Sequence, residues 1–96
     1  MSLIAKQTPY RRGRLLALLR DANKNGMSVP LLRTTLNGWG YKADPDTIDI
    51  DVSWLHRYEL IERRVIAGVE LLSITERGLA VVTGNLDFPG IELIED

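Results

Sequence analysis

The chain has 96 residues, of which 45% are hydrophobic and 26% charged, and its formal net charge is −1. This length supports one domain with a single small core, and the composition is that of an ordinary globular chain. The absence of cysteine excludes disulfides and thiolate chemistry. No apolar run approaches the roughly 20 residues of a membrane helix, and the first ten residues lack the apolar stretch of a signal peptide. We therefore expect an intracellular protein with no membrane contact.

The near-zero net charge hides a strong asymmetry between the two halves of the chain. Residues 1–42 contain eight lysines and arginines and one acid, whereas residues 43–96 contain four arginines and twelve acids. Such a split indicates either a basic surface for a polyanionic partner or a self-complementary assembly. A third interpretation is that the two halves neutralise each other within the fold.

Three helices are predicted in the first 60 residues, each marked by its starting residues. Thr8-Pro9 predicts the start of the first helix, with Thr8 as N-cap and Pro9 as the first helical residue. Ser28 predicts the cap of the second helix, which ends at the glycines on either side of Trp39. Asp44-Pro45 opens the third helix in the same way as Thr8-Pro9, and its early aspartates suit the positive end of a helix dipole.

A β-hairpin and a short helix are predicted after Tyr58. Residues 60–67 and 69–75 read as two strands joined by a turn at Ala67-Gly68. Thr75 then caps a short helix that ends at Gly84, and residues 85–96 form an apolar and acidic tail. The predicted fold is mainly α with a small antiparallel β-hairpin. It is a winged helix-turn-helix with a three-helix core, a two-stranded wing and a short C-terminal helix, in one domain over residues 1–96 whose core spans about residues 8–84.

Several short motifs carry a family resemblance. They lie over residues 14–91, and their order and spacing are more specific than any one of them. They are Leu31-Leu32, Leu36 and Gly40; Thr47-Ile48, Asp51-Val52-Ser53-Trp54-Leu55 and Glu59-Leu60-Ile61-Glu62; and Leu72-Ser73-Ile74-Thr75-Glu76-Arg77-Gly78-Leu79 and Pro89-Gly90-Ile91. With these motifs the chain resembles the MarR/ArsR-like winged-helix superfamily, and more closely the small winged-helix proteins of Mu-like phages and prophages.

The resemblance implies a phage-encoded protein that acts in the cytoplasm of the bacterial host, as a homodimer that binds double-stranded DNA and regulates transcription. Two features depart from the family. Its members often end in a basic tail, whereas this chain ends with Glu92, Glu95 and Asp96. The outward face of the third helix, which often carries arginine in such regulators, has Asp49.

The helical period assigns the third helix an inner face and an outer face. At about 100° per residue, Ile48, Val52 and Leu55 point to the core, and Asp51 lies on one flank. The residues expected to approach DNA bases are Asp46, Thr47, Asp49, Ile50, Ser53 and Arg57. The residues expected to contact the DNA backbone are Arg11, Arg12, Arg14, Arg33 and Lys42, and those expected to do so from the wing are Arg63 and Arg64.

An alternative function uses the same helix as a protein-docking surface. Carboxylates add no affinity for phosphate, so Asp46 and Asp49 weigh against DNA binding. In this alternative, the acidic helix docks a basic protein partner in phage assembly, packaging or lysis, with Ile50 and Trp54 as an apolar pair in the interface. The other interpretation of Trp54 is that it packs against the wing or the first helix as part of the core.

Catalytic and metal chemistry find little support in the sequence. His56 is the only histidine and has no catalytic partners in its pattern. The aspartates at 44, 46, 49 and 51 suggest a calcium loop, but on a helix they spread around the cylinder instead of surrounding one ion. No glycine-rich phosphate loop or nucleophile elbow is present. We expect no enzyme activity, no cofactor and no bound metal.

Overall fold

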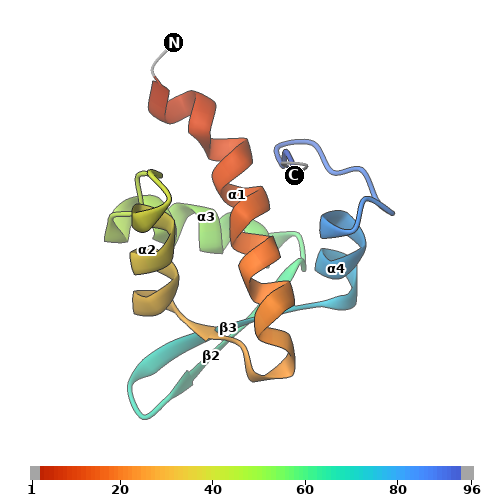
Figure 1. Ribbon diagram of the computed structural model, residues 1–96. Helices are drawn as coiled ribbons and strands as arrows, with labels where there is room; N and C mark the ends of the chain where they lie inside the picture. The colour runs from red at the N-terminus through yellow and green to blue at the C-terminus, as the bar shows by residue number, and fades with distance from the viewer. Residues whose placement is uncertain (1–2, 94–96) are drawn as a thin grey trace.

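The structure, a computed structural model, describes residues 3–93, without the side chains of residues 3–5 and 24. Over these residues the order is α1, η1, β1, α2, α3, β2, β3, α4, where η1 is a short 3-10 helix at Asn23–Asn25. The chain is mainly helical with a small antiparallel sheet, which confirms that part of the prediction. Figure 1 shows the β2–β3 hairpin projecting below α1, α2 and α3, with α4 beside α1. Within residues 3–93, no helix is both long and apolar enough to cross a membrane.

The first helix begins earlier than the sequence predicts. α1 spans Leu3–Ala22, so Pro9 lies inside the helix and Thr8 is not its N-cap. Proline lacks the N–H that would donate to the carbonyl four residues before it, but its fixed φ is compatible with a helix. The Thr8 hydroxyl instead accepts a hydrogen bond of 3.3 Å from Nη2 of Arg11. The Thr8-Pro9 pattern was therefore the wrong start signal.

The other three helices begin where their capping residues predict. α2 spans Val29–Gly38, and the Ser28 side chain accepts from the backbone N–H of Leu31. α3 spans Pro45–Arg57 and is capped by Asp44. α4 spans Glu76–Val82, and the Thr75 hydroxyl accepts from the Gly78 N–H at 3.0 Å. In each case a short polar side chain satisfies one of the unpaired N–H groups of a first helical turn.

The sheet has three strands, where the sequence predicted two. β2 (Ile61–Ile66) and β3 (Val69–Ile74) form the predicted hairpin, and β1 (Met27–Ser28) pairs antiparallel with β3 on its other side. The strand order is β1-β3-β2, which leaves β2 at the edge. With two residues, β1 is too short to show an alternating pattern.

The hairpin closes through the predicted turn at Ala67-Gly68. Both residues have positive φ, 52° and 78°, as a type I′ turn requires at its two central positions. Ile66 and Val69 face each other across this two-residue loop, which fixes the register of the whole hairpin.

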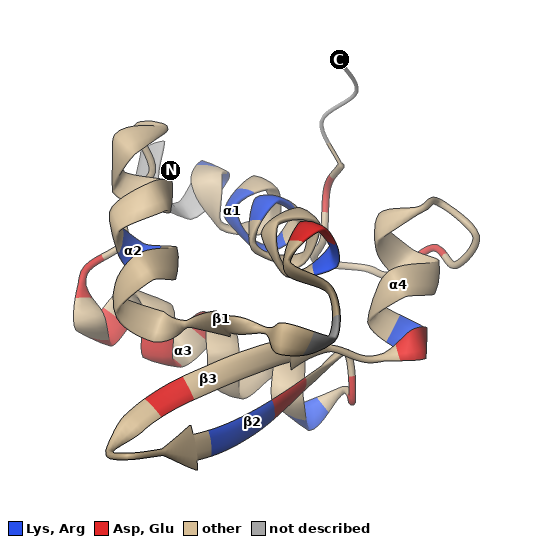
Figure 2. Ribbon diagram, turned by 60° about the horizontal axis from the view of Figure 1, so that its bottom comes forward, with Lys and Arg blue, Asp and Glu red and all other residues tan. Residues whose placement is uncertain are grey.

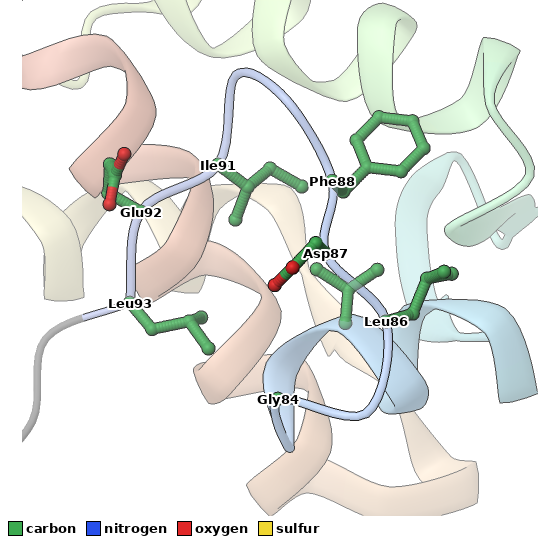
Figure 3. A pocket seen from close by; sticks show the side chains of 8 residues that line it. Gly84, Leu86, Asp87, Phe88, Ile91, Glu92 and Leu93 are labelled. Atoms are coloured by element: carbon green, nitrogen blue, oxygen red, sulfur yellow. The ribbon is translucent and has the colours of Figure 1, made fainter.

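The C-terminal tail, residues 85–93 of the described chain, folds back on the helices. The backbone N–H of Glu92 donates to the Pro9 carbonyl at 3.0 Å, and Ile91 joins the buried core. A β-carbon at Gly13 would lie 2.1 Å from the Glu92 carbonyl oxygen, so glycine is what allows this close approach. Figure 3 shows the tail curving around a small hollow, about 200 Å³, whose wall includes Leu86, Phe88, Ile91 and Leu93.

Candidate functional site on α3 and the hairpin

The start of α3 is fixed by a network at Asp44. Its carboxylate accepts a 2.6 Å bond from the Thr47 hydroxyl and a 3.3 Å bond from the Thr47 N–H. The Thr47 hydroxyl bond is the main cause that lowers the pKa of the Asp44 carboxyl below its ordinary value, and Lys42 adds a weaker effect. The Thr47 hydroxyl is thus engaged in the cap, although the sequence predicted that it approaches a DNA base.

The predicted inner and outer faces of α3 are largely confirmed. Ile48, Val52 and Leu55 are buried in the core. On the outer face, Asp46, Asp49, Ile50 and Arg57 are exposed, and Ser53 is half-buried. Ile50 is a large apolar side chain with 64% of its surface exposed.

The sequence placed Asp51 on a flank of α3, but in the structure α1 covers this residue. Its side chain has no exposed surface, and it accepts hydrogen bonds from Nε and Nη2 of Arg11 and, at 3.1 Å, from Nε of Arg12. Arg11 is itself only 3% exposed. Two of the arginines predicted to contact the DNA backbone are therefore turned inward and share one buried carboxylate.

The remaining backbone candidates also have partners within the protein. Nε of Arg33 donates to the Ala43 carbonyl at 2.8 Å, and Lys42 lies 3.8 Å from the Asp44 carboxylate. The Arg14 guanidinium lies over the Trp39 ring, 5.5 Å from its centroid. In these positions the cations hold α1, α2 and the α2–α3 loop together.

Trp54 packs against α1 and the tail. Its ring is half-buried, with the Arg12 guanidinium 4.1 Å from its centroid and edge contacts to Tyr58 and Phe88. Gly90 also lies against this ring. Of the apolar pair proposed for a protein interface, Ile50 is thus exposed while Trp54 is largely used internally.

Arg63 connects the hairpin to α3. Its guanidinium lies 2.9 Å from Glu70 on β3 and 3.7 Å from Asp49 on α3, and a 3.4 Å bond joins it to the Ser53 hydroxyl. Arg64, the next residue, is exposed on the opposite face of β2. Figure 2 shows the basic segment of β2 close to the acidic segment of β3, with acidic segments of α3 behind them.

A hollow with an acidic rim lies where α3 meets α2 and β3. Its volume is about 320 Å³. Val29, Pro45, Ile48 and Val52 supply apolar walls, and Asp46, Asp49 and Glu70 supply carboxylates at the rim. Such a lining suits a long aliphatic side chain that ends in a positive charge, because its methylene groups can pack on the walls while its charge meets the rim.

Five of the seven residues that line this hollow were not among the predicted site residues: Val29, Pro45, Ile48, Val52 and Glu70. Glu70 lies on β3 and Val29 at the start of α2, and neither is near α3 in the sequence. Residues that are paired across a hairpin lie on the same face of the sheet, and side chains along a strand alternate between faces. Glu70 is paired with Val65, so this pattern could have placed Glu70 on the same face as Val65 and Arg63. Nothing local to Val29 marks it as part of a site.

Neither metal binding nor similarity to known proteins assigns a role to this site. Within the described part of the chain, no group of three histidines or carboxylates is placed to hold a metal ion. No protein-family model matches the chain, and neither a curated protein nor a solved structure shows significant similarity to it.

Proposed function

We propose that this chain is a winged-helix domain, of phage or prophage origin, that uses its exposed α3 face to dock a basic segment of another protein. The helix pair α2 and α3 followed by the β2–β3 hairpin supports the winged-helix assignment. The observation that carries the docking function is the hollow lined by Asp46, Asp49 and Glu70, whose three carboxylates face a single cation of the described chain, Arg63.

The positions of the cations favour a protein partner over DNA. Affinity for DNA depends on lysines and arginines that reach the phosphates. Arg11 and Arg12 neutralise Asp51, and Arg63 is paired with Asp49 and Glu70. Among the candidate cations, only Arg57 and Arg64 are exposed without a carboxylate partner in residues 3–93. Two such cations provide little phosphate neutralisation beside exposed aspartates.

The docked segment is expected to present a lysine or arginine next to an apolar residue. The long side chain enters the hollow, with its stem against Val29 and Pro45 and its charge among the carboxylates. The apolar neighbour contacts Ile50, which has no apolar cover of its own. Interfaces typically combine an apolar centre with a polar rim in this way.

Selection from a library of random twelve-residue peptides tests this function. Enriched peptides should carry lysine or arginine beside an apolar residue, and they should lose binding to the double variant Asp46→Asn/Asp49→Asn. Asp87→Asn is a matched control, since it removes an exposed acid of the tail that does not line the hollow. Peptides that bind the double variant as tightly as the wild type would contradict the docking function.

DNA binding is a second candidate, favoured by the exposed Arg57 and Arg64 on α3 and the hairpin. Fluorescence anisotropy with labelled duplexes across a salt range tests it. If DNA is bound through these arginines, Arg57→Ala/Arg64→Ala should reduce the log–log salt slope by about 2. Duplex binding with such a slope, without selection of basic peptides, would favour DNA over the docking function.

A further inference from the structure

The two most exposed large apolar side chains in the described part of the chain lie beside the acidic hollow. Val65 on β2 has 68% of its surface accessible, and Ile50 on α3 has 64%. Single exposed apolar residues are normal on a protein surface. These two, however, lie next to carboxylates that line the same hollow, and they come from different elements. Their shared position indicates a shared role in what the hollow binds.

Val65 lies beside Glu70 on the face of the hairpin that is turned to α3. Arg63 contacts α3 through Ser53, and Val65, two residues further along the strand, points to the same side. Val65 is also the cross-strand partner of Glu70. Side chains that are directly opposite each other in an antiparallel pair have their β-carbons roughly 4.5–5.5 Å apart. An apolar group and a carboxylate are therefore offered side by side at the hairpin.

Ile50 occupies the corresponding position on α3. It follows Asp46 by four residues, and both side chains are exposed. Residues four apart are neighbours on a helix surface, with β-carbons roughly 5–6 Å apart. The hollow thus has two similar pairs at its rim, each with one carboxylate and one exposed apolar residue. One pair is Asp46 with Ile50, and the other is Glu70 with Val65.

Arg63 leaves part of the negative charge of the hollow unbalanced. Its Nε and Nη2 both contact the same oxygen of Glu70, Oε1, at 3.0 and 2.9 Å. Among the described residues, no donor bonds to Oε2 of Glu70 and no cation pairs with Asp46. Asp49 has only the 3.7 Å contact with Arg63. A cation that enters the hollow therefore finds acceptor oxygens near Val65 as well as near Ile50.

We propose that the docked segment carries its basic residue between two apolar residues, one that packs on Ile50 and one that packs on Val65. This motif rests on the docking function proposed above, and it adds the hairpin to the binding surface. The charge of the basic residue meets the carboxylates, while its two apolar neighbours cover the two most exposed apolar side chains. Removal of this apolar surface from water contributes affinity that charge alone does not supply.

Peptide selection on the wild type and on three variants tests the motif. From a library of random twelve-residue peptides, the wild type should enrich sequences with an apolar residue on both sides of a lysine or arginine. Ile50→Thr should remove the preference on one side, and Val65→Thr should remove it on the other. Ile66→Thr is the matched control, because Ile66 is the exposed neighbour of Val65 on the opposite face of β2. It should leave both preferences intact.

Fluorescence anisotropy with one enriched peptide, labelled at its end, measures the size of the hairpin contact. Val65→Thr replaces a methyl group by a hydroxyl and should weaken binding on the order of four-fold, whereas Ile66→Thr should not change it. Circular dichroism checks that the variants are folded, as expected for substitutions at exposed positions. Equal affinity of Val65→Thr and the wild type, or apolar residues on one side only, would overturn the motif and leave the docking function standing. If no basic peptides are enriched, both are overturned.

Discussion

Asp49 and Asp51 lie two residues apart on α3 and have opposite environments. Asp49 is 71% exposed, whereas Asp51 is fully buried between Arg11 and Arg12. In the sequence, Asp49 weighed against a DNA-binding helix, and Asp51 was assigned to a flank of that helix. Only one of them reaches the surface, and the other holds α1 against α3.

Removal of the Asp51 charge should strongly destabilise the protein. Asp51→Asn leaves two arginines without a counter-charge, one of them buried, and breaking such a buried group costs about 3–5 kcal/mol. Chemical denaturation should reveal the loss as a lower midpoint. Asp49→Asn is the matched control and should change the free energy of unfolding by less than about 1 kcal/mol, since surface pairs contribute little. Equal effects of the two substitutions would contradict the buried pairing.

The Asp44 cap should give the stability a component that depends on pH. Because the folded-state pKa of its carboxyl is lowered, mainly by the Thr47 hydroxyl, the ionised cap stabilises the fold at neutral pH. This contribution is complete above the unfolded-state pKa and is lost as the pH falls through the lower folded-state pKa. The melting temperature of the wild type should therefore exceed that of Asp44→Asn at pH 7, and the difference should shrink in acid. A difference that stays constant down to pH 2 would exclude this role.

At the scale of elements, the sequence predicted those features that a few neighbouring residues determine. The caps Ser28, Asp44 and Thr75 and the turn at Ala67-Gly68 all lie where their local chemistry indicates. The predicted start of α1 was wrong because Pro9 is compatible with a helix interior when other contacts support the helix. β1 and the docked tail depend on partners far away in the sequence, so no local pattern could reveal them.

The contact between α1 and the tail should depend on the missing side chain of Gly13. Gly13→Ala inserts a methyl group at the Glu92 carbonyl, so we expect the tail to be displaced and the backbone amides of Ile91 and Glu92 to exchange faster with deuterium. Gly38→Ala is the control, since a β-carbon there meets nothing within 4 Å. It should stabilise the protein by about 0.5–1 kcal/mol through helix propensity. Unchanged exchange in Gly13→Ala would show that the tail is not held by this contact.

The hairpin turn carries a residue that is suboptimal for its conformation. Ala67 has a φ of 52°, a left-handed conformation that costs an L-residue roughly 1–2 kcal/mol. Ala67→Gly should relieve this strain and raise the melting temperature. The same substitution at Ala80, inside α4, should lower it, because glycine disfavours a helix by about 1 kcal/mol. If both substitutions lower the melting temperature, the turn is not strained as described.

At the scale of the whole molecule, part of the charge split of the sequence is neutralised between the two halves of the chain. Of the interpretations that the sequence left open, internal neutralisation accounts for the pairs of Arg11 and Arg12 with Asp51 and of Lys42 with Asp44. The composition could not distinguish internal neutralisation from a basic surface, because it does not show that α1 packs against α3. The hollow escaped prediction for a similar reason, since its wall combines Val29, Ile48 and Glu70 from three separate elements.

This neutralisation predicts weak binding to polyanions despite the basic first half of the chain. On a heparin column the protein should elute below about 0.15 M salt, the range in which exposed charges are already substantially screened. An unrelated basic domain of equal size provides the comparison. Retention well above that concentration, lost in Arg57→Ala/Arg64→Ala, would instead reveal a functional cationic surface.

The position of Trp54 gives the molecule an internal optical reporter. Its ring touches Arg12 of α1 on one side and Phe88 and Gly90 of the tail on another, whereas Trp39 is half exposed beside Arg14. In a Trp39→Phe background, the emission wavelength of the one remaining indole would follow its contact with the tail. Release of residues 85–93 would then appear as a red shift in a stopped-flow trace.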